Sequence, residues 1–92
     1  MRPSKKYQAY AREFARRRIE AAERDGGRCV LCGGPAAEVH HIVYRSHGGT
    51  NDLDNLACLC LTCHRLAHGV DAKEIREILR RRCGGGELPE AD

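Results

Sequence analysis

Two Cys-x2-Cys pairs constrain the fold of this chain more than any other feature. The first pair is Cys29 and Cys32, and the second is Cys60 and Cys63. A Cys-x2-Cys turn points two thiolates at one ion, and two such turns supply the four ligands of a tetrahedral structural zinc site. The chain has 92 residues, of which 4% are Phe, Trp or Tyr, so its core is too small to stabilise a fold without a crosslink. We therefore expect these four cysteines to bind structural Zn²⁺.

Six cysteines in a short chain also fit a disulfide-bonded protein. The basic segment at residues 1–6 leads into no apolar run of the kind that an export signal requires, so we expect reduced thiols. Cys58 lies in an apolar segment, where we expect a packed thiol. Cys83 closes a predicted helix, and we expect it to be an exposed thiol without a function.

Positive charge is concentrated near the start of the chain. Residues 1–28 hold nine of the 16 Lys and Arg residues but only four of the 13 Asp and Glu residues. Thirteen of the 16 cations are Arg, whose forked guanidinium suits phosphate contacts. No apolar run approaches the ~20 residues of a membrane span, so we expect no membrane partner.

Residues 5–24 are predicted to form a helix. They contain no Gly or Pro, and their apolar side chains recur near the 3.6-residue period. Ser4 is a candidate N-cap, and two glycines at 26–27 end the helix. The opposite face either is solvated or contacts phosphates, and both interpretations can hold together. We expect residues 1–27 to form a basic N-terminal helix packed on the core. The arginines on the opposite face are Arg12, Arg16 and Arg17.

The rest of the chain divides into a core, a helix and a tail. In the core, residues 28–70, we predict a short strand at 38–44, either a helical turn or a strand at 53–60, and a helix at 61–69 with Thr62 as a candidate cap. Residues 71–83 are predicted to form a further helix, with Asp71 and Glu74 spaced as a capping box. Residues 84–92 combine three glycines with three acidic residues, and we expect a disordered acidic tail.

Histidines form a second group of candidate ligands. His40 and His41 are adjacent within the predicted strand, so they face opposite sides, and one can bind a metal while the other acts on something nearby. His64 and His68 are four residues apart on a predicted helix and project from one face, the spacing by which two imidazoles grip one cation. That helix starts beside Cys63, so the zinc site would fix its position. The alternatives are a chance surface pair and a His40 that packs as an ordinary strand residue.

The motifs follow one another along the chain as Cys29-x2-Cys32, Val39-His40-His41-Ile42, Gly48-Gly49-Thr50-Asn51-Asp52, Asn55-Leu56 and Leu59-Cys60-x2-Cys63-His64-x3-His68. In this order they resemble the HNH endonucleases, which have a ββα-metal active site, here in a zinc-containing form. The resemblance covers roughly residues 10–70, and the three letters fall on His41, Asn55 and His64. It implies an α+β fold, namely a small zinc-stapled ββα-metal (treble-clef-like) domain with flanking helices.

The resemblance also implies a role for each polar residue. His41 would be the general base that activates water for attack on a phosphodiester, which suits an imidazole. His40 and His64 would hold a catalytic divalent ion, with His68 as a third ligand. Asn55 would hold the loop and orient His41 through its side-chain amide; a turn-forming Asn is a compatible alternative. The ion would polarise the scissile phosphate and neutralise charge on the leaving 3′ oxygen.

Ligation by three neutral imidazoles favours borderline metals. We expect Mn²⁺, Ni²⁺, Co²⁺ or Zn²⁺ to support activity, and Mg²⁺ to support it less well. Arg45 follows the expected base, and Arg65 lies on the helix of His64, so both are candidate phosphate contacts, with a solvated arginine as the alternative. His47 is expected to be an exposed loop side chain.

We expect a metal-dependent HNH endonuclease that hydrolyses DNA with low sequence specificity, by nicking or by double-strand cleavage. Few residues lie outside the catalytic core for reading bases. The first alternative is a non-catalytic zinc-containing module that binds DNA. The second is a thiol-redox protein, which two Cys-x2-Cys pairs without a βαβ pattern disfavour. The resemblance further implies a bacteriophage protein, with phage DNA-packaging proteins as partners, in the cytoplasm of a bacterial or phage-infected cell. We expect a monomer rather than a homodimer.

Overall fold

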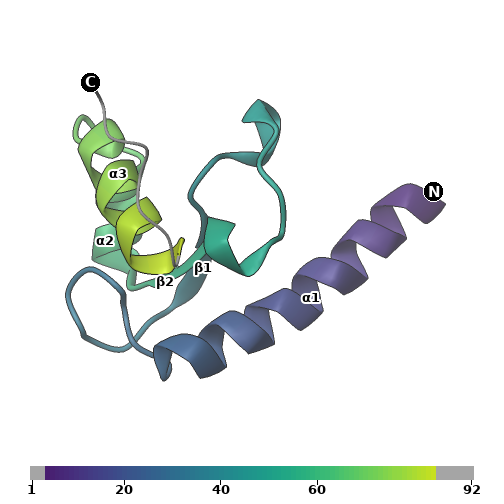
Figure 1. The fold of residues 1–92 in the computed structure, drawn as a ribbon, viewed down its shortest axis with the longest axis horizontal. Helices are drawn as coiled ribbons and strands as arrows, with labels where there is room; N and C mark the ends of the chain where they lie inside the picture. The colour runs from purple at the N-terminus through teal and green to yellow at the C-terminus, as the bar shows by residue number, and fades with distance from the viewer. Residues whose placement is uncertain (1–3, 85–92) are drawn as a thin grey trace.

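The computed structural model describes residues 4–84, and in that part of the chain helices flank a two-stranded sheet (Figure 1). The elements are α1 (Lys5–Asp25), β1 (Glu38–His41), β2 (Leu56–Leu59), α2 (Leu61–Ala67) and α3 (Ala72–Cys83), with 3₁₀ helices at Arg45–His47 and Leu53–Asn55. Strands β1 and β2 pair antiparallel, with Glu38 opposite Leu59 and His41 opposite Leu56. The order β1, β2, α2 and the flanking helices confirm the predicted α+β class. None of the helices in the described part is long and apolar enough to cross a membrane.

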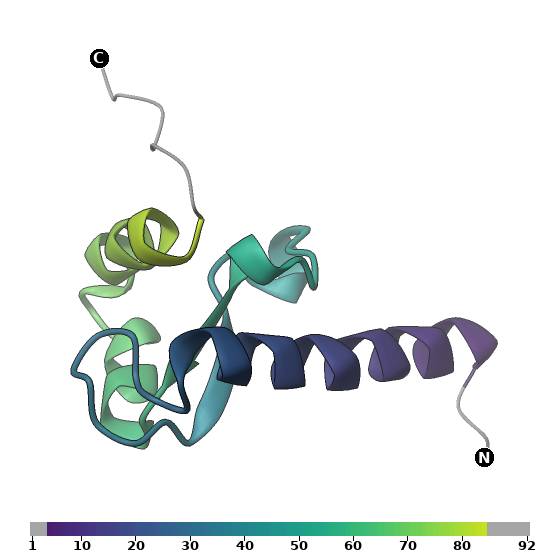
Figure 2. The same cartoon turned by 60° about the horizontal axis from the view of Figure 1, so that its bottom comes forward.

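Helix α1 begins and ends where the sequence predicts. The Ser4 hydroxyl accepts a hydrogen bond from the backbone N–H of Tyr7 at 3.1 Å, which satisfies one of the unpaired N–H groups of the first turn. Gly26 ends the helix in the left-handed conformation, with φ of 64°, which a glycine adopts without a steric penalty. Figure 2 shows that the N-terminal half of α1 extends well beyond the sheet.

The C-terminal end of α1 is the part that is fastened to the sheet. Ala21 is buried there against Leu56 and Cys58 of β2. The Arg24 guanidinium donates to the backbone carbonyls of Leu53 and Leu56, at 2.6 Å each. The neighbouring Asp25 carboxylate accepts from the backbone N–H of Cys58 at 3.4 Å. These contacts fix the direction in which α1 leaves the core.

A second core cluster lies between β2, α2 and α3. It includes Ile42, Leu59, Leu79 and Cys83, all of which are buried. The prediction that Cys83 is exposed is therefore wrong. Cys83 is one helical turn after Leu79, so it shares the buried face of α3 and is only 8% exposed. The prediction for Cys58 is confirmed, since this thiol is buried, and burial together with Asp25 raises its pKa to about 12.

Local boundaries differ from the predictions where side chains take over backbone hydrogen bonds. Strand β1 ends at His41 rather than at residue 44. Residues 53–60 contain both predicted alternatives, a 3₁₀ turn followed by a strand. The cap of α2 is Cys60, whose sulfur accepts from the Cys63 N–H, and not Thr62. Asp71 precedes α3 but makes no side-chain cap hydrogen bond, so the capping box with Glu74 does not form. Apart from Gly84, the tail predicted to be disordered lies outside the described residues.

Candidate metal centres and active site

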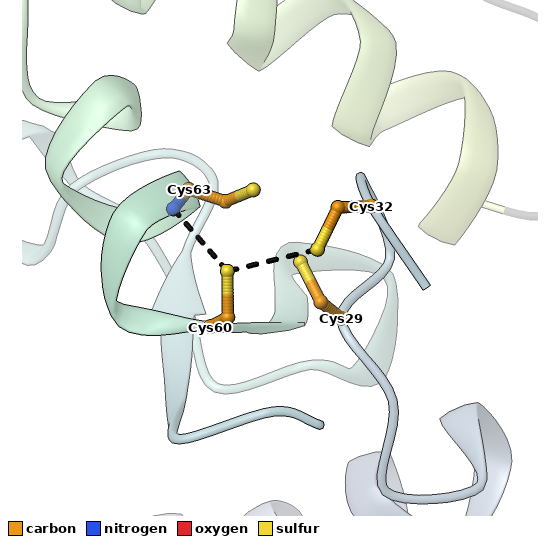
Figure 3. A group of neighbouring side chains, drawn as sticks. All are labelled: Cys29, Cys32, Cys60 and Cys63. Carbon is orange, nitrogen blue, oxygen red and sulfur yellow. Dashed lines mark hydrogen bonds between the residues drawn. The ribbon is translucent and has the colours of Figure 1, made fainter. Parts of the chain in front are cut away.

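Four thiols converge at the junction of the Cys29–Cys32 loop with α2 (Figure 3). Their sulfurs all lie within 4.8 Å of one another, and Cys32 Sγ is 3.7 Å from Cys60 Sγ. Sulfurs bound to one tetrahedral zinc ion at ~2.3 Å are separated by about 3.8 Å. All four are free thiols, so none of them is used in a disulfide. The four-cysteine cluster therefore fits a zinc ion in both ligand type and spacing.

Backbone hydrogen bonds at this cluster favour the thiolate of Cys29, whereas the pKa values of Cys32 and Cys63 are raised. The N–H of Cys29 donates to the Gly34 carbonyl at 2.7 Å, and the N–H of Gly33 donates to the Cys29 carbonyl at 2.9 Å, which closes a tight turn. Burial disfavours the Cys29 thiolate, but hydrogen bonds from the backbone at residues 31, 32 and 60 outweigh it and lower the pKa of Cys29 to about 6. A thiolate is the form of cysteine that binds metal.

Three imidazoles form a second cluster, which we call the histidine site: His40 from β1, and His64 and His68 from the end of α2. One nitrogen from each lies within 4.8 Å of the others, and the Nε2 atoms of His64 and His68 are 3.2 Å apart. Burial and the two neighbouring imidazoles lower the pKa of His40 to about 4, so it is neutral at pH 7 and has a lone pair for a cation. The Oε2 atom of Glu38 lies 2.6 Å from Nδ1 of His64, so the other ring nitrogen of His64, Nε2, is the one that points to the centre of the histidine site. The donor set thus fits a divalent cation.

His41 points to different partners from His40, as expected of adjacent residues on a strand. Its Nε2 is 2.8 Å from Asn51 Oδ1 and 3.4 Å from the Tyr10 hydroxyl. The Phe14 ring packs beside it, with a centroid distance of 4.9 Å. An amide oxygen only accepts hydrogen bonds, so the proton lies on His41 Nε2 and the lone pair on Nδ1. The Asn51 amide oxygen therefore favours one tautomer of His41, and Tyr10 and Phe14 of α1 contact its ring.

Asn55 fastens that loop but does not contact His41. Its Oδ1 accepts from the Val43 N–H at 2.8 Å, and its Nδ2 donates to the carbonyls of Val43 and Thr50. The Asn55 amide thus holds the loop, as expected, and the side chain that reaches His41 directly is Asn51. Asn51 is 4% exposed and belongs to the same Gly-Gly-Thr-Asn-Asp segment. No sequence pattern identifies this contact, because it depends on how the loop folds back onto His41.

The three residues of the histidine site and His41 line one cleft, which we call the histidine cleft. Its volume is about 490 Å³, and its walls come from β1, the following loop and α2. A Cβ on Gly49 would collide with the backbone carbonyl of Val43, so only glycine permits this close turn of the loop. The residues that line the cleft are Val39, His40, His41, Tyr44, Arg45, Ser46, His64 and His68.

The predicted arginine contacts are divided between this cleft and other surfaces. Arg45 lines the cleft, and its guanidinium lies 3.7 Å from the centroid of the Tyr10 ring. Arg65 is exposed on α2. On α1, Arg16 and Arg17 pair with Glu20 at 3.7 and 3.1 Å, and the exposed Arg12 reaches the carbonyl of the preceding turn. The α1 arginines predicted to contact DNA are not among the residues that line the cleft.

Comparison with known proteins shows what the central segment of the chain is similar to. Residues 29–69 match the family model described as HNH endonuclease, and this segment contains both cysteine pairs and all the histidines discussed here. This segment is similar to an HNH endonuclease domain, and the resemblance recognised from the sequence is confirmed for it.

Two curated relatives have nuclease names. The chain is 46% identical over 48 residues to the type IV methyl-directed restriction enzyme EcoKMcrA of Escherichia coli K12, a match that covers 51% of this chain. It is 53% identical over 36 residues to the probable mobile endonuclease C of enterobacteria phage T4, covering 39% of this chain. Each match covers 17% of the relative, so the chain spans about one sixth of either protein.

Proposed function

We propose that this chain is a metal-dependent DNA endonuclease of the HNH type. The observation that carries the proposal is that one cleft holds a three-imidazole cation site and a fourth imidazole, that of His41, in a fixed tautomer. Hydrolysis of a phosphodiester needs a base for the attacking water and positive charge at the phosphate. The HNH domain match and the nuclease names of both relatives support this reading.

In this mechanism His41 is the general base. Its Nδ1 lone pair accepts a proton from the attacking water, while Asn51 Oδ1 accepts the hydrogen bond of Nε2–H. The resulting imidazolium is stabilised because Nε2–H keeps its acceptor throughout the step. Asn55 acts through the backbone, since it ties the loop of Asn51 to the start of β2. The P–O3′ bond breaks and the leaving 3′ oxygen takes a proton from a second water molecule, so the products are a 5′-phosphate and a 3′-hydroxyl.

His40, His64 and His68 are the residues that would hold the catalytic ion. When bound, a divalent ion supplies charge stabilisation to the scissile phosphate and its leaving oxygen. Three neutral nitrogens favour Mn²⁺, Ni²⁺, Co²⁺ or Zn²⁺ over Mg²⁺. Plasmid cleavage with Mg²⁺ alone, and none with the other ions, would contradict this ligand assignment.

The four-cysteine cluster would hold structural Zn²⁺ that positions the histidine site. Helix α2 starts at Cys60 and Cys63, so an ion bound there sets the place of His64 one residue later. Arg45 at the cleft, Arg65 on α2 and the arginines of α1 are the proposed phosphate contacts. Phage DNA-packaging proteins remain candidate partners, and low sequence specificity and a monomeric state remain part of the proposal.

A supercoiled-plasmid assay tests the function. Wild-type protein is compared with His41→Ala, both with measured zinc content and both assayed with EDTA and with each divalent ion. We expect metal-dependent nicked or linear product from the wild type, and a rate lower by about 10²-fold or more for the variant. Equal cleavage by both proteins would rule out His41 as the base. DNA binding without cleavage by either would instead support the non-catalytic zinc-containing DNA-binding module.

A further inference from the structure

A second groove lies beside the histidine cleft, between α1 and the segment that includes β1 and the start of its following loop. We call it the α1 groove. Its volume is about 490 Å³, and it shares Val39, His41 and Arg45 with the histidine cleft. The two hollows therefore meet at the proposed general base. A DNA strand bound with its scissile phosphate in the cleft would have the α1 groove beside it.

Aromatic rings are concentrated in this groove. Tyr7, Tyr10 and Phe14 line it, and they are three of the four Phe and Tyr residues in the chain. Ala11 and Ala15 lie between them on the same face of α1, and their single methyl groups leave the groove open between the larger side chains. Tyr7 is 54% exposed, so its ring is not needed to fill the core. Its aromatic surface is available to a ligand.

The charged groups of the groove are basic. Arg18 and Arg45 line it, and no Asp or Glu does. The Arg45 guanidinium lies 3.7 Å from the Tyr10 ring centroid, and this cation–π contact holds it where the two hollows meet. Arg18 lies 5.5 Å from the Phe14 centroid. Aromatic faces beside arginines form the surface on which single-stranded nucleic acids bind, with bases stacked and phosphates paired.

We infer that the α1 groove takes one unpaired nucleotide of the DNA strand next to the phosphate being cut, with its base stacked on Tyr7 and its phosphate beside Arg45. This inference rests on the proposed nuclease function, because it names the form of DNA that the same site accepts. The groove has the size of sites that take a small organic ligand, ~300–1,000 Å³. A base that is paired within a duplex has its faces covered by its neighbours and cannot stack on Tyr7. The protein therefore prefers DNA with an extruded or unpaired base.

The test compares two short duplexes that differ only in a single-nucleotide bulge. Binding of each is followed by fluorescence anisotropy without the catalytic ion, and a 2-aminopurine in the bulge reports stacking. The first variant is Tyr7→Ala. The second is Ala11→Leu, which fills the groove with a residue that favours helix, so that unfolding does not explain its effect. The matched control is Ile19→Ala, also on α1, 62% exposed and outside the groove lining.

We expect the wild type and Ile19→Ala to bind the bulged duplex more tightly than the paired one. Tyr7→Ala and Ala11→Leu should each bind the bulged duplex about 5- to 100-fold more weakly, with little change for the paired one. Equal binding of both duplexes by the wild type, or no loss in the two groove variants, would overturn the inference. If the wild type shows either of these results but still cleaves plasmid, the nuclease proposal holds and only the inference on the α1 groove fails. If the bulge preference is lost as expected but no ion supports cleavage, the groove stands and the nuclease proposal fails.

Discussion

The two ring nitrogens of His64 have different partners, which determines the nitrogen available to an ion. Nδ1 lies 2.6 Å from the Glu38 carboxylate, whereas Nε2 faces His68 Nε2 at 3.2 Å. The carboxylate holds the proton on Nδ1 and leaves the Nε2 lone pair for the cation. Glu38 is thus a positioning residue for the histidine site, although it is not itself a member of that cluster.

Replacing Glu38 with Gln tests this role. We expect the affinity of the histidine site for Ni²⁺ or Mn²⁺ to fall about 10- to 100-fold, because a neutral amide holds the Nδ1 proton of His64 less strongly than a carboxylate does. Isothermal titration of protein already loaded with zinc measures the affinity. The circular dichroism spectrum should not change. The matched control is Glu23→Gln on α1, and a loss of equal size in that variant would contradict a specific role for Glu38.

Asn51 has the corresponding role for His41. We expect Asn51→Ala to lower kcat about 10- to 100-fold with little change in KM, because the imidazole loses the acceptor that fixes its tautomer. The informative control is the double variant with His41→Ala. Two residues that act as a unit give a double variant no slower than His41→Ala alone. Additive losses would show that Asn51 acts independently of the base.

Site residues that lie close together in the sequence could be predicted to share a site. Contacts between residues that are far apart in the sequence could not be predicted. The spacing in Cys60-x2-Cys63 and in His64-x3-His68 already places each pair on one turn of chain. Asn51 reaches His41 only because the intervening loop folds back, and Tyr10 reaches it from another helix, 31 residues earlier. A hydrogen bond of that kind depends on the path of the chain, which no local pattern contains.

Among the elements, α1 depends most on a few polar contacts. Its buried apolar contact with β2 is small, because Ala21 is its fully buried residue in the described part of the chain. Arg24 adds to this small apolar contact by donating two hydrogen bonds, to the backbone carbonyls of Leu53 and Leu56. The orientation of α1, and with it the α1 groove, therefore depends in large part on the Arg24 guanidinium, together with Asp25.

Replacing Arg24 with Ala should lower the free energy of unfolding by roughly 1.5–3 kcal/mol, the range for hydrogen bonds that involve a charged group. Urea unfolding followed by circular dichroism measures the change. Arg12→Ala, on the exposed side of the same helix, should change it by less than about 0.5 kcal/mol. Similar values for both variants would show that the Arg24 contacts do not stabilise the attachment of α1.

Helix positions could be predicted because periodicity and caps are local. Ser4 and Gly26 bounded α1 correctly. The strand assignment failed because a distant side chain, that of Asn55, pairs with the backbone of Val43, so β1 ends early. The cap assignment failed because the nearby Cys60 sulfur caps α2 in place of Thr62. The exposure of Cys83 could not be judged from its place at the end of a helix, since it depends on which face of α3 meets β2.

On the scale of the whole molecule, one structural ion is expected to hold both the fold and the catalytic geometry. The cysteine pairs join the loop before β1 to the start of α2, and α2 carries two of the three imidazoles of the histidine site. Binding free energy at a structural zinc site is also folding free energy. Loss of that ion should therefore weaken a second metal site whose own ligands are intact.

Cys63→Ser and Cys83→Ala separate this coupling from ordinary packing, because both thiols are buried in the same core cluster. We expect Cys63→Ser to lose bound zinc, to unfold at a lower temperature and to bind Ni²⁺ at the histidine site more weakly. Cys83→Ala should keep its zinc and its Ni²⁺ affinity, with only the ~1–2 kcal/mol cost of a small cavity. Elemental analysis, thermal unfolding and isothermal titration measure the three quantities. If Cys63→Ser does not fold, stripping zinc from the wild type with a thiol reagent gives the same comparison. Unchanged Ni²⁺ affinity after zinc loss would show that the histidine site forms independently of the cysteines.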